Sequence, residues 1–203
     1  GDRQAHRNAV VLARAFEGVG VQMLTVHGRT REQGYKGHAE YDTVAAVKGA
    51  VRVPVVANGD IATPERAREV LAATGADAIM IGRAAQGRPW IFREIAHFLA
   101  TGEHLASPLV AEVRRLLLEH LQDHYALYGE FTGVRSARKH IGWYVKNLPG
   151  AEAFRARMNL VEDSASQWQS VAAFFDELGD SMDRMPATAS QNNNEEEAVE
   201  EGA

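Results

Sequence analysis

The stretch from residue 53 to residue 83 constrains the fold more than any other part of this 203-residue chain. It begins with a short apolar run, Val53–Ala57, and ends with a second one, Ala78–Ile81. The residues between them predict a helix, since Thr63 suits the N-cap and Pro64 suits the first helical turn. Continuous apolar strands that alternate with helices are typical of a parallel sheet covered by helices. The stretch therefore predicts an α/β fold.

The same pattern extends to both sides of this stretch. A strand is predicted at residues 21–26, after a helix at 5–18, and a further helix follows at 89–99. No strand is expected after Ile81, and the remaining helices are predicted at 108–128, 134–148, 152–159 and 164–178. We therefore expect three domains: a fragment of a β/α barrel or doubly wound sheet at 1–101, a small all-α helical bundle at 108–180, and a disordered acidic tail at 186–203.

The composition excludes several kinds of function. The chain has no cysteine, which rules out disulfides, thiolate metal sites and cysteine catalysis within it. No apolar run approaches membrane-spanning length and no signal-peptide pattern is present, so we expect a soluble cytoplasmic protein. The five glutamates of the tail account for the whole net charge of −5. Any basic patch on the folded part is therefore local.

Two of the predicted strands end in glycine and polar residues. Asn58, Gly59 and Asp60 follow one strand, and Gly82 and Arg83 follow the next. Glycine lets backbone N–H groups approach a phosphate, the next helix presents its positive end, and the arginine adds a charged fork. Ordinary turns between strand and helix would explain one such loop. Because two come in succession, we favour phosphate binding.

A third polar cluster follows the strand at 21–26. His27 can hydrogen-bond a ring or a ribityl chain, and Arg29 and Arg31 can meet phosphates. A solvated loop with a capping histidine explains His27 equally well. Both interpretations stay open from the residues alone.

The helix at 134–148 carries a basic face. Arg135, Lys139 and Lys146 fall on that face and Arg138 flanks it, with no acidic residue between Gly133 and Lys146. Such a face is usually plain solvated surface, but the lack of acids favours contact with a phosphate backbone.

His120 and His124 lie one helical turn apart, a spacing that suits a metal ion. No third ligand is evident in the sequence. We therefore predict packing or surface roles for both histidines and no metal site.

Taken together, these residues resemble the bacterial tRNA-dihydrouridine synthases, and the B-type branch most closely. The resemblance extends from about Gly1 to Leu178, and several motifs in the same order make it specific. The motifs are Val26–Arg31, Val55–Ile61, Ile79–Phe92, and Arg138–His140 with Trp143 and Tyr144.

The resemblance implies the last three β/α units of a TIM (β/α)8 barrel, followed by a helical tRNA-binding domain. It implies an FMN-dependent oxidoreductase that reduces the uridine C5–C6 double bond in tRNA, with NADPH as the reductant of the flavin. The cofactor-binding residues would be His27, Asn58, Gly59, Asp60, Gly82 and Arg83. The tRNA-binding residues would be Arg29, Arg31, Arg135, Arg138 and Lys139.

The chain also departs from the family pattern. It matches only the last three of eight strands, and the family's catalytic cysteine and flavin-contacting lysine belong to the part it does not match. We therefore expect no catalytic residue in this chain, and an inactive piece of an enzyme that is monomeric at full length. A non-catalytic RNA- or phosphate-binding module that uses the same surfaces is the alternative. The basic helix argues against a third interpretation, an unrelated flavin oxidoreductase barrel.

Overall fold

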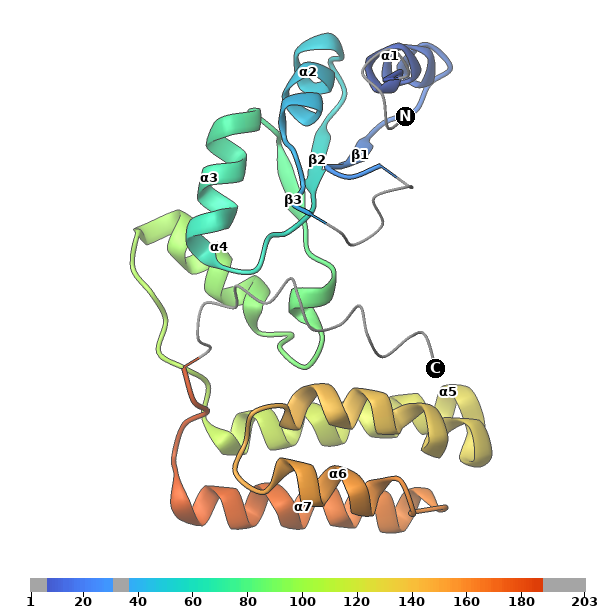
Figure 1. Ribbon diagram of the computed structural model, residues 1–203, viewed down its shortest axis with the longest axis vertical. Helices are drawn as coiled ribbons and strands as arrows, with labels where there is room; N and C mark the ends of the chain where they lie inside the picture. Colours follow the sequence, from blue (N-terminus) through green and yellow to red (C-terminus); the bar gives the residue numbers. More distant parts are fainter. Residues whose placement is uncertain (1–6, 31–36, 188–203) are drawn as a thin grey trace. The chain divides into compact units, whose positions relative to one another are not determined.

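A computed structural model describes residues 7–30 and 37–187 of the chain (Figure 1). The chain divides into two compact units. In its described residues the first, the sheet unit, comprises 7–30, 37–84 and 93–103. The second, the helical unit, comprises 85–92 and 104–187. Among the described residues, no helix combines the length and the apolar character needed to cross a membrane. The sequence predicts a disordered tail at 186–203, and residues 188–203 of it lie outside the described part of the chain.

The sheet unit is built on three parallel strands in the order β1-β2-β3, as the sequence predicts (Figure 1). The strands are β1 (Leu24–His27), β2 (Val55–Asn58) and β3 (Ala78–Met80). The helices of this region are α1 (Ala9–Gly18), α2 (Asp42–Ala50), α3 (Pro64–Thr74) and α4 (Ile91–Thr101), with a short 3-10 turn, η2 (Arg83–Ala85), after β3.

Helix α3 begins and ends where the sequence predicts. The Thr63 hydroxyl accepts a hydrogen bond from the backbone N–H of Arg66, and Pro64 occupies the first turn. Gly75 ends the helix in the left-handed conformation, at a φ of 65°. These local signals fix the length of α3 and thereby the point at which the chain enters β3.

The two faces of the sheet have different surroundings. On one face, Val55 and Ala57 are fully buried, and helices α2 and α3 pack against β2. On the other face, Thr25 and Ala78 flank Val56 in register and are exposed. Parallel strands are normally covered on both faces. We call this second face the open face, because Thr25 and Ala78 on it are exposed, although Val56 between them is only 6% exposed.

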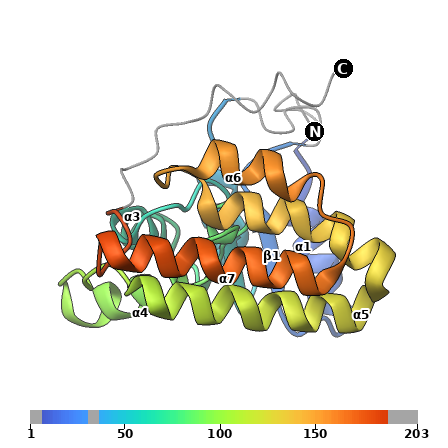
Figure 2. The same ribbon diagram turned by 90° about the horizontal axis from the view of Figure 1, so that it is seen from below.

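The helical unit consists of α5 (Val110–Val145), α6 (Ala151–Met158) and α7 (Ser164–Ser181). Helix α5 is broken at Gly129, whose φ of 73° and ψ of 174° are not helical. Its first arm, residues 110–128, and its second arm, residues 130–145, fold back on each other as an antiparallel hairpin (Figures 1 and 2). The predicted end of the first helix is confirmed. The second helix begins earlier than predicted, because Gly129 alone makes the turn and Gly133 is helical.

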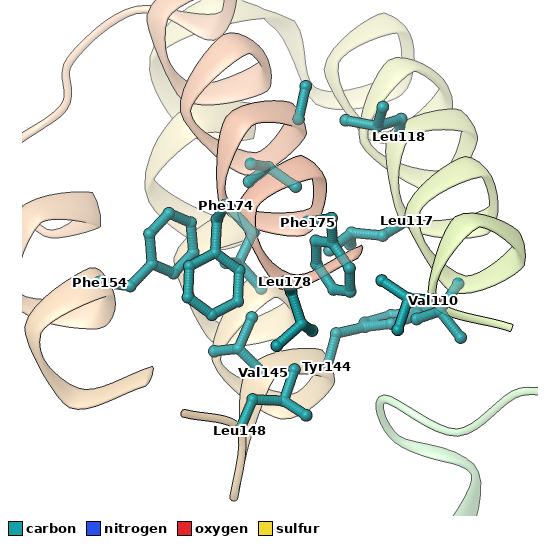
Figure 3. Packing of buried hydrophobic residues seen from close by; sticks show 14 of the residues in the cluster. Val110, Leu117, Leu118, Tyr144, Val145, Leu148, Phe154, Phe174, Phe175 and Leu178 are labelled. Atoms are coloured by element: carbon teal, nitrogen blue, oxygen red, sulfur yellow. The ribbon is translucent and has the colours of Figure 1, made fainter. Parts of the chain in front are cut away.

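Aromatic and aliphatic side chains from all three helices form the core of the helical unit (Figure 3). The rings of Phe154 from α6 and Phe174 from α7 stack with centroids 4.2 Å apart. Phe175 is 1% exposed and points toward Leu117 of the first arm, which is fully buried. Burial of each such side chain contributes roughly 1.5–3 kcal/mol. The core therefore holds both arms of the hairpin to α6 and α7.

One polar side chain, Gln167 of α7, is fully buried within this core. Its amide nitrogen donates to the carbonyl oxygen of Val134 in the second arm at 3.1 Å. Its amide oxygen accepts from the hydroxyl of Tyr125 in the first arm at 2.7 Å. Burial raises the pKa of Tyr125 well above its ordinary value, so the phenol stays protonated and remains a donor. Gln167 thus joins both arms to α7.

We expect Gln167→Met and Tyr125→Phe each to destabilise the helical unit by about 1–3 kcal/mol, because the first leaves the Tyr125 hydroxyl, and the second the Gln167 amide oxygen, without its partner. The double variant should cost less than the sum of the two, since it removes both partners. Urea unfolding followed by tryptophan fluorescence measures this unit alone, because it contains every tryptophan of the chain. These are Trp90, Trp143 and Trp168. Additive effects in the double variant would contradict the coupling.

The segment after η2 requires a glycine for its packing in the helical unit. Gly87 has a φ of 68°, and a Cβ there would lie 2.3 Å from the carbonyl oxygen of Trp143. Trp90 follows, 9% exposed, with its ring edge-on to Tyr144 at 6.3 Å. We therefore expect Gly87→Ala to destabilise the helical unit by about 2–4 kcal/mol, through left-handed strain and overpacking.

Gly179→Ala is the matched control for Gly87→Ala. Gly179 lies inside α7, and a Cβ there would make ordinary contact with Val110 at 4.0 Å. Alanine in a helix interior is favoured over glycine by about 0.5–1 kcal/mol. The same tryptophan-monitored urea unfolding should show a midpoint that falls for Gly87→Ala and holds or rises for Gly179→Ala. Equal midpoints in the two variants would contradict the packing argument.

Candidate functional site

The carboxyl ends of the three strands place their polar residues side by side. His27 of β1 is in register with Asn58 of β2, which is in register with Met80 of β3. The side-chain amide of Asn58 donates to the carbonyl oxygen of Met80 at 2.9 Å. The backbone carbonyl oxygen of Asn58 accepts from the N–H of Gly28 at 2.9 Å. This row belongs to the open face of the sheet, where His27 and Met80 are exposed. The sequence prediction that these strand ends meet is confirmed.

Asp60 joins the loops that follow the strands. Its carboxylate accepts from the guanidinium of Arg29 at 2.7 Å and from the N–H of Ala39 at 2.7 Å. Its other oxygen lies 3.5 Å from the guanidinium of Arg83. The Arg29 side chain is 2% exposed and also donates to the carbonyl oxygen of Gly37 at 2.8 Å. One carboxylate thus holds together the loops after β1, β2 and β3.

The two glycines of the predicted phosphate site differ in their surroundings. A Cβ on Gly59 would lie 2.7 Å from the Cβ of Ala39, and its φ is 130°, so the packing of the loop itself requires glycine. A Cβ on Gly82 would meet nothing within 4 Å. The backbone of Gly82 is exposed, and the side chain of Arg83 beside it is 40% exposed. An open backbone next to a guanidinium suits a phosphate group.

Tyr41 fixes the Gly59 loop from the side of α2. Its hydroxyl donates to the carbonyl oxygen of Gly59, and the guanidinium of Arg66 lies over its ring at 5.0 Å. Burial raises the pKa of Tyr41 above its ordinary value, although the charge of Arg66 opposes the shift. The phenol therefore remains a donor at neutral pH. The sequence prediction did not include Tyr41, because nothing near it in the chain marks the contact.

The predicted site residues of the sheet unit separate into two groups. His27, Asn58, Gly82 and Arg83 lie along the carboxyl edge of the sheet. Asp60 faces the arginines and the N–H of Ala39. That Arg29 contacts tRNA stays a prediction; in this structure its guanidinium is enclosed by Asp60 and Gly37. Arg31 lies outside the described residues.

The basic face predicted on the second arm of α5 is present. Arg135, Lys139 and Lys146 are exposed. Arg138 is half-buried, and its guanidinium donates to the carbonyl oxygen of Val161 at 2.8 Å. Arg138 therefore ties the second arm to the segment before α7, and its predicted contact with tRNA stays a prediction.

The structure adds residues to this face that the sequence prediction missed. Phe131, 69% exposed, carries the guanidinium of Arg135 over its ring at 3.8 Å. A Cβ on Gly142 would lie 3.5 Å from the Nε of Arg155, so this arginine of α6 extends the basic face over the glycine. An exposed aromatic beside the turn at Gly129 could have pointed to Phe131. Arg155 had no such signal, because it belongs to another helix.

A third histidine joins the two that the sequence placed on one helix. Donor nitrogens of His120, His124 and His140 all lie within 4.8 Å of one another. The sequence did not make this third histidine evident, and the packing or surface roles expected for His120 and His124 stay a prediction. His140 is on the second arm of α5, and the antiparallel fold at Gly129 brings it back to the first arm.

The sequence is similar to known proteins over most of its length. The dihydrouridine synthase (Dus) family matches residues 1–179. The chain is 56% identical over 180 residues to the tRNA-dihydrouridine synthase B of Pseudomonas putida, covering 89% of this chain and 53% of that protein. It is 57% identical over 172 residues to the protein of the same name in Pseudomonas aeruginosa, covering 85% and 52%. The Shewanella oneidensis protein of that name is 57% identical over 173 residues, covering 85% and 53%.

The chain spans about half the length of these curated relatives. The family match covers the sheet unit and the helical unit up to α7. The chain belongs to the dihydrouridine synthase family.

Proposed function

We propose that residues 1–101 supply the last three β/α units of a TIM (β/α)8 barrel and that residues 108–180 form a tRNA-binding helical domain. The open face of the sheet supports the first part of this proposal. In a closed barrel the inward face of each strand is covered by the strands opposite. The exposed Thr25, Ala78 and Met80 belong to the face that such a closure would bury.

At full length we propose a flavin-dependent oxidoreductase that reduces the C5–C6 double bond of a uridine in tRNA. FMN would supply the hydride chemistry, with NADPH as its reductant, and the protein would act as a cytoplasmic monomer. This assignment rests on family membership and on relatives named tRNA-dihydrouridine synthase B. The observation in the chain that carries it is the carboxyl edge of the sheet, where Asp60 draws three loops together beside the exposed Gly82 and Arg83.

The residues at that edge fit the phosphate end of FMN. Gly82 offers an open backbone and Arg83 a cation, while His27 and Asn58 line the open face toward the flavin. Gly59 and Asp60 shape the loop. Asp60 is better placed to orient Arg83 than to touch a phosphate, because its carboxylate would repel that anion. Arg29 is buried beside Asp60, so in this proposal it too supports the loops and does not contact the phosphate.

The basic face fits a tRNA backbone. Arg135 and Lys139 are exposed along the second arm, Lys146 is exposed directly after it, and Arg155 lies beside Gly142. Phe131 adds an aromatic surface under Arg135. Cations of this kind can neutralise backbone phosphates, and an exposed aromatic ring can stack on an unpaired base.

We expect Arg83→Ala to weaken FMN binding by about 1.5–3 kcal/mol, because it removes a charge-assisted phosphate contact. The test uses a protein of the relatives' full length that carries these residues, and it measures flavin retained after dialysis. Arg52→Ala is the matched control, since Arg52 is exposed and precedes β2 at the opposite end of the sheet.

Two results would count against the flavin proposal. Unchanged retention in Arg83→Ala would remove Arg83 from the phosphate site. A full-length protein that binds tRNA but never retains a yellow chromophore would favour the alternative, a non-catalytic RNA-binding module on the same surfaces.

We expect Arg135→Ala/Lys139→Ala to weaken tRNA binding and to lower the slope of log affinity against log salt by roughly 0.7–0.9 for each phosphate that the protein no longer neutralises. Arg115→Ala/Arg157→Ala is the control. It also removes two exposed cations of the helical unit, but from the first arm and from α6. A salt titration of tRNA binding compares the two double variants. Equal slopes in both would show that the basic face contributes only through the overall charge of the protein and would contradict a specific contact with tRNA.

A further inference from the structure

Three histidines face one another across the hairpin of α5. His120 and His124 are on the first arm and His140 is on the second. The His140 ring centroid lies 4.9 Å from that of His120 and 4.9 Å from that of His124. One donor nitrogen from each ring lies within 4.8 Å of the others. Neither the flavin site nor the basic face uses this cluster.

A hydrogen bond sets the tautomer of the most buried member. His124 is 8% exposed, and its Nε2 lies 2.7 Å from the hydroxyl oxygen of Ser136 on the second arm. That hydroxyl donates its own proton to the carbonyl oxygen of Thr132 at 2.7 Å. The Ser136 oxygen therefore accepts from Nε2–H of His124. The lone pair of His124 is left on Nδ1, as in a metal-ligating histidine whose other nitrogen is held by a hydrogen bond.

The surroundings favour neutral imidazoles. Burial, with a smaller effect of His120, lowers the pKa of His124 below its ordinary value. Burial first, then the neighbouring histidines and Lys139, lower the pKa of His140. A neutral imidazole is the form that binds a metal ion.

Aromatic rings pack against two of the histidines. The ring of Tyr128 lies 4.6 Å from that of His124, and the ring of Trp143 lies edge-on to His140 at 5.0 Å. These rings cover part of the cluster, in which His124 is buried and His120 and His140 are half-buried.

We propose that His120, His124 and His140 form a binding site for one divalent transition-metal ion of the Zn²⁺ type, which links the two arms of the α5 hairpin. Three imidazoles with an open fourth position are a known ligand set for Zn²⁺. Tetrahedral bonds of about 2.1 Å would set the donor nitrogens about 3.4 Å apart. The half-buried rings of His120 and His140 would approach the fixed ring of His124 to reach that spacing.

The ion would stabilise the hairpin that presents the basic face. His140 directly follows Lys139, and its ring contacts Trp143, over which the Lys139 ammonium lies at 5.2 Å. A ligand that binds the folded chain and not the unfolded one raises its stability by mass action.

The test uses the 203-residue chain without an affinity tag, after removal of metal ions with a chelator. Co²⁺ is titrated first, because a tetrahedral Co²⁺ site gives an intense visible absorption band, and Zn²⁺ is then added to displace it. We expect one Co²⁺ per chain, loss of the band on addition of Zn²⁺, and a higher melting temperature with Zn²⁺.

His140→Phe is the central variant, because it keeps an aromatic ring in the cluster but provides no donor nitrogen. It should abolish both the band and the thermal shift. Ser136→Ala should keep the band but weaken metal affinity by about 10–100-fold, since it frees the ring of His124. His97→Ala, a histidine of α4 outside the cluster, should bind Co²⁺ as the unaltered chain does.

Circular dichroism of each metal-free variant establishes that it is folded. If His140→Phe is unfolded, His120→Gln replaces it, since His120 is half-buried. The absence of a band in the unaltered chain would overturn the proposal. Binding of an adventitious ion only would also overturn the proposal. That outcome is recognised by several bound ions per chain and by equal metal affinity in His140→Phe.

Discussion

The Asp60 carboxylate is the contact on which the arrangement of the sheet unit depends. It accepts from Arg29 after β1, lies beside Arg83 after β3, and itself follows β2. The Arg29 side chain is 2% exposed, so loss of its partner would leave a buried charge uncompensated, a defect that costs about 3–5 kcal/mol. Asp60 has a φ of 47°, an uncommon conformation for a residue with a side chain, and its hydrogen bonds hold it there. The loop geometry at the strand ends thus depends on one carboxylate.

The helical unit depends on a different kind of constraint, the turn at Gly129. Its position decides which residues of the two arms face each other, and so it places Ser136 and His140 against His124. Gln167 then fixes the hairpin to α7 through a hydrogen bond to each arm. A turn displaced by one residue would rotate the second arm by about 100° and separate these partners.

The sequence predicts what local signals determine. Apolar runs and glycines locate the three strands, and the cap residues locate α3. Contacts between residues far apart in the chain could not be predicted, because no local pattern encodes them. Arg29 is 31 residues from Asp60, so the residues around it in the chain do not predict its enclosure. The sequence predicts that the second arm begins at residue 134, whereas the turn is at Gly129. The predicted position of the turn therefore gave no indication that His140 lies beside the other two histidines.

Large apolar side chains are exposed in both units, and in the sheet unit they include a residue of the open face. The helical unit encloses Phe154, Phe174 and Phe175 among its own helices. The sheet unit leaves Met23 57% exposed and Met80, on the open face, 46% exposed. Exposed apolar surface forgoes roughly 25 cal/mol for each Å². A few such side chains amount to several kcal/mol, a large part of the roughly 5–15 kcal/mol that stabilises a domain. The stability of the sheet unit, and with it the geometry at Gly82 and Arg83, should therefore depend on a further covering surface, whereas the helical unit should keep its hairpin and its histidine cluster without one.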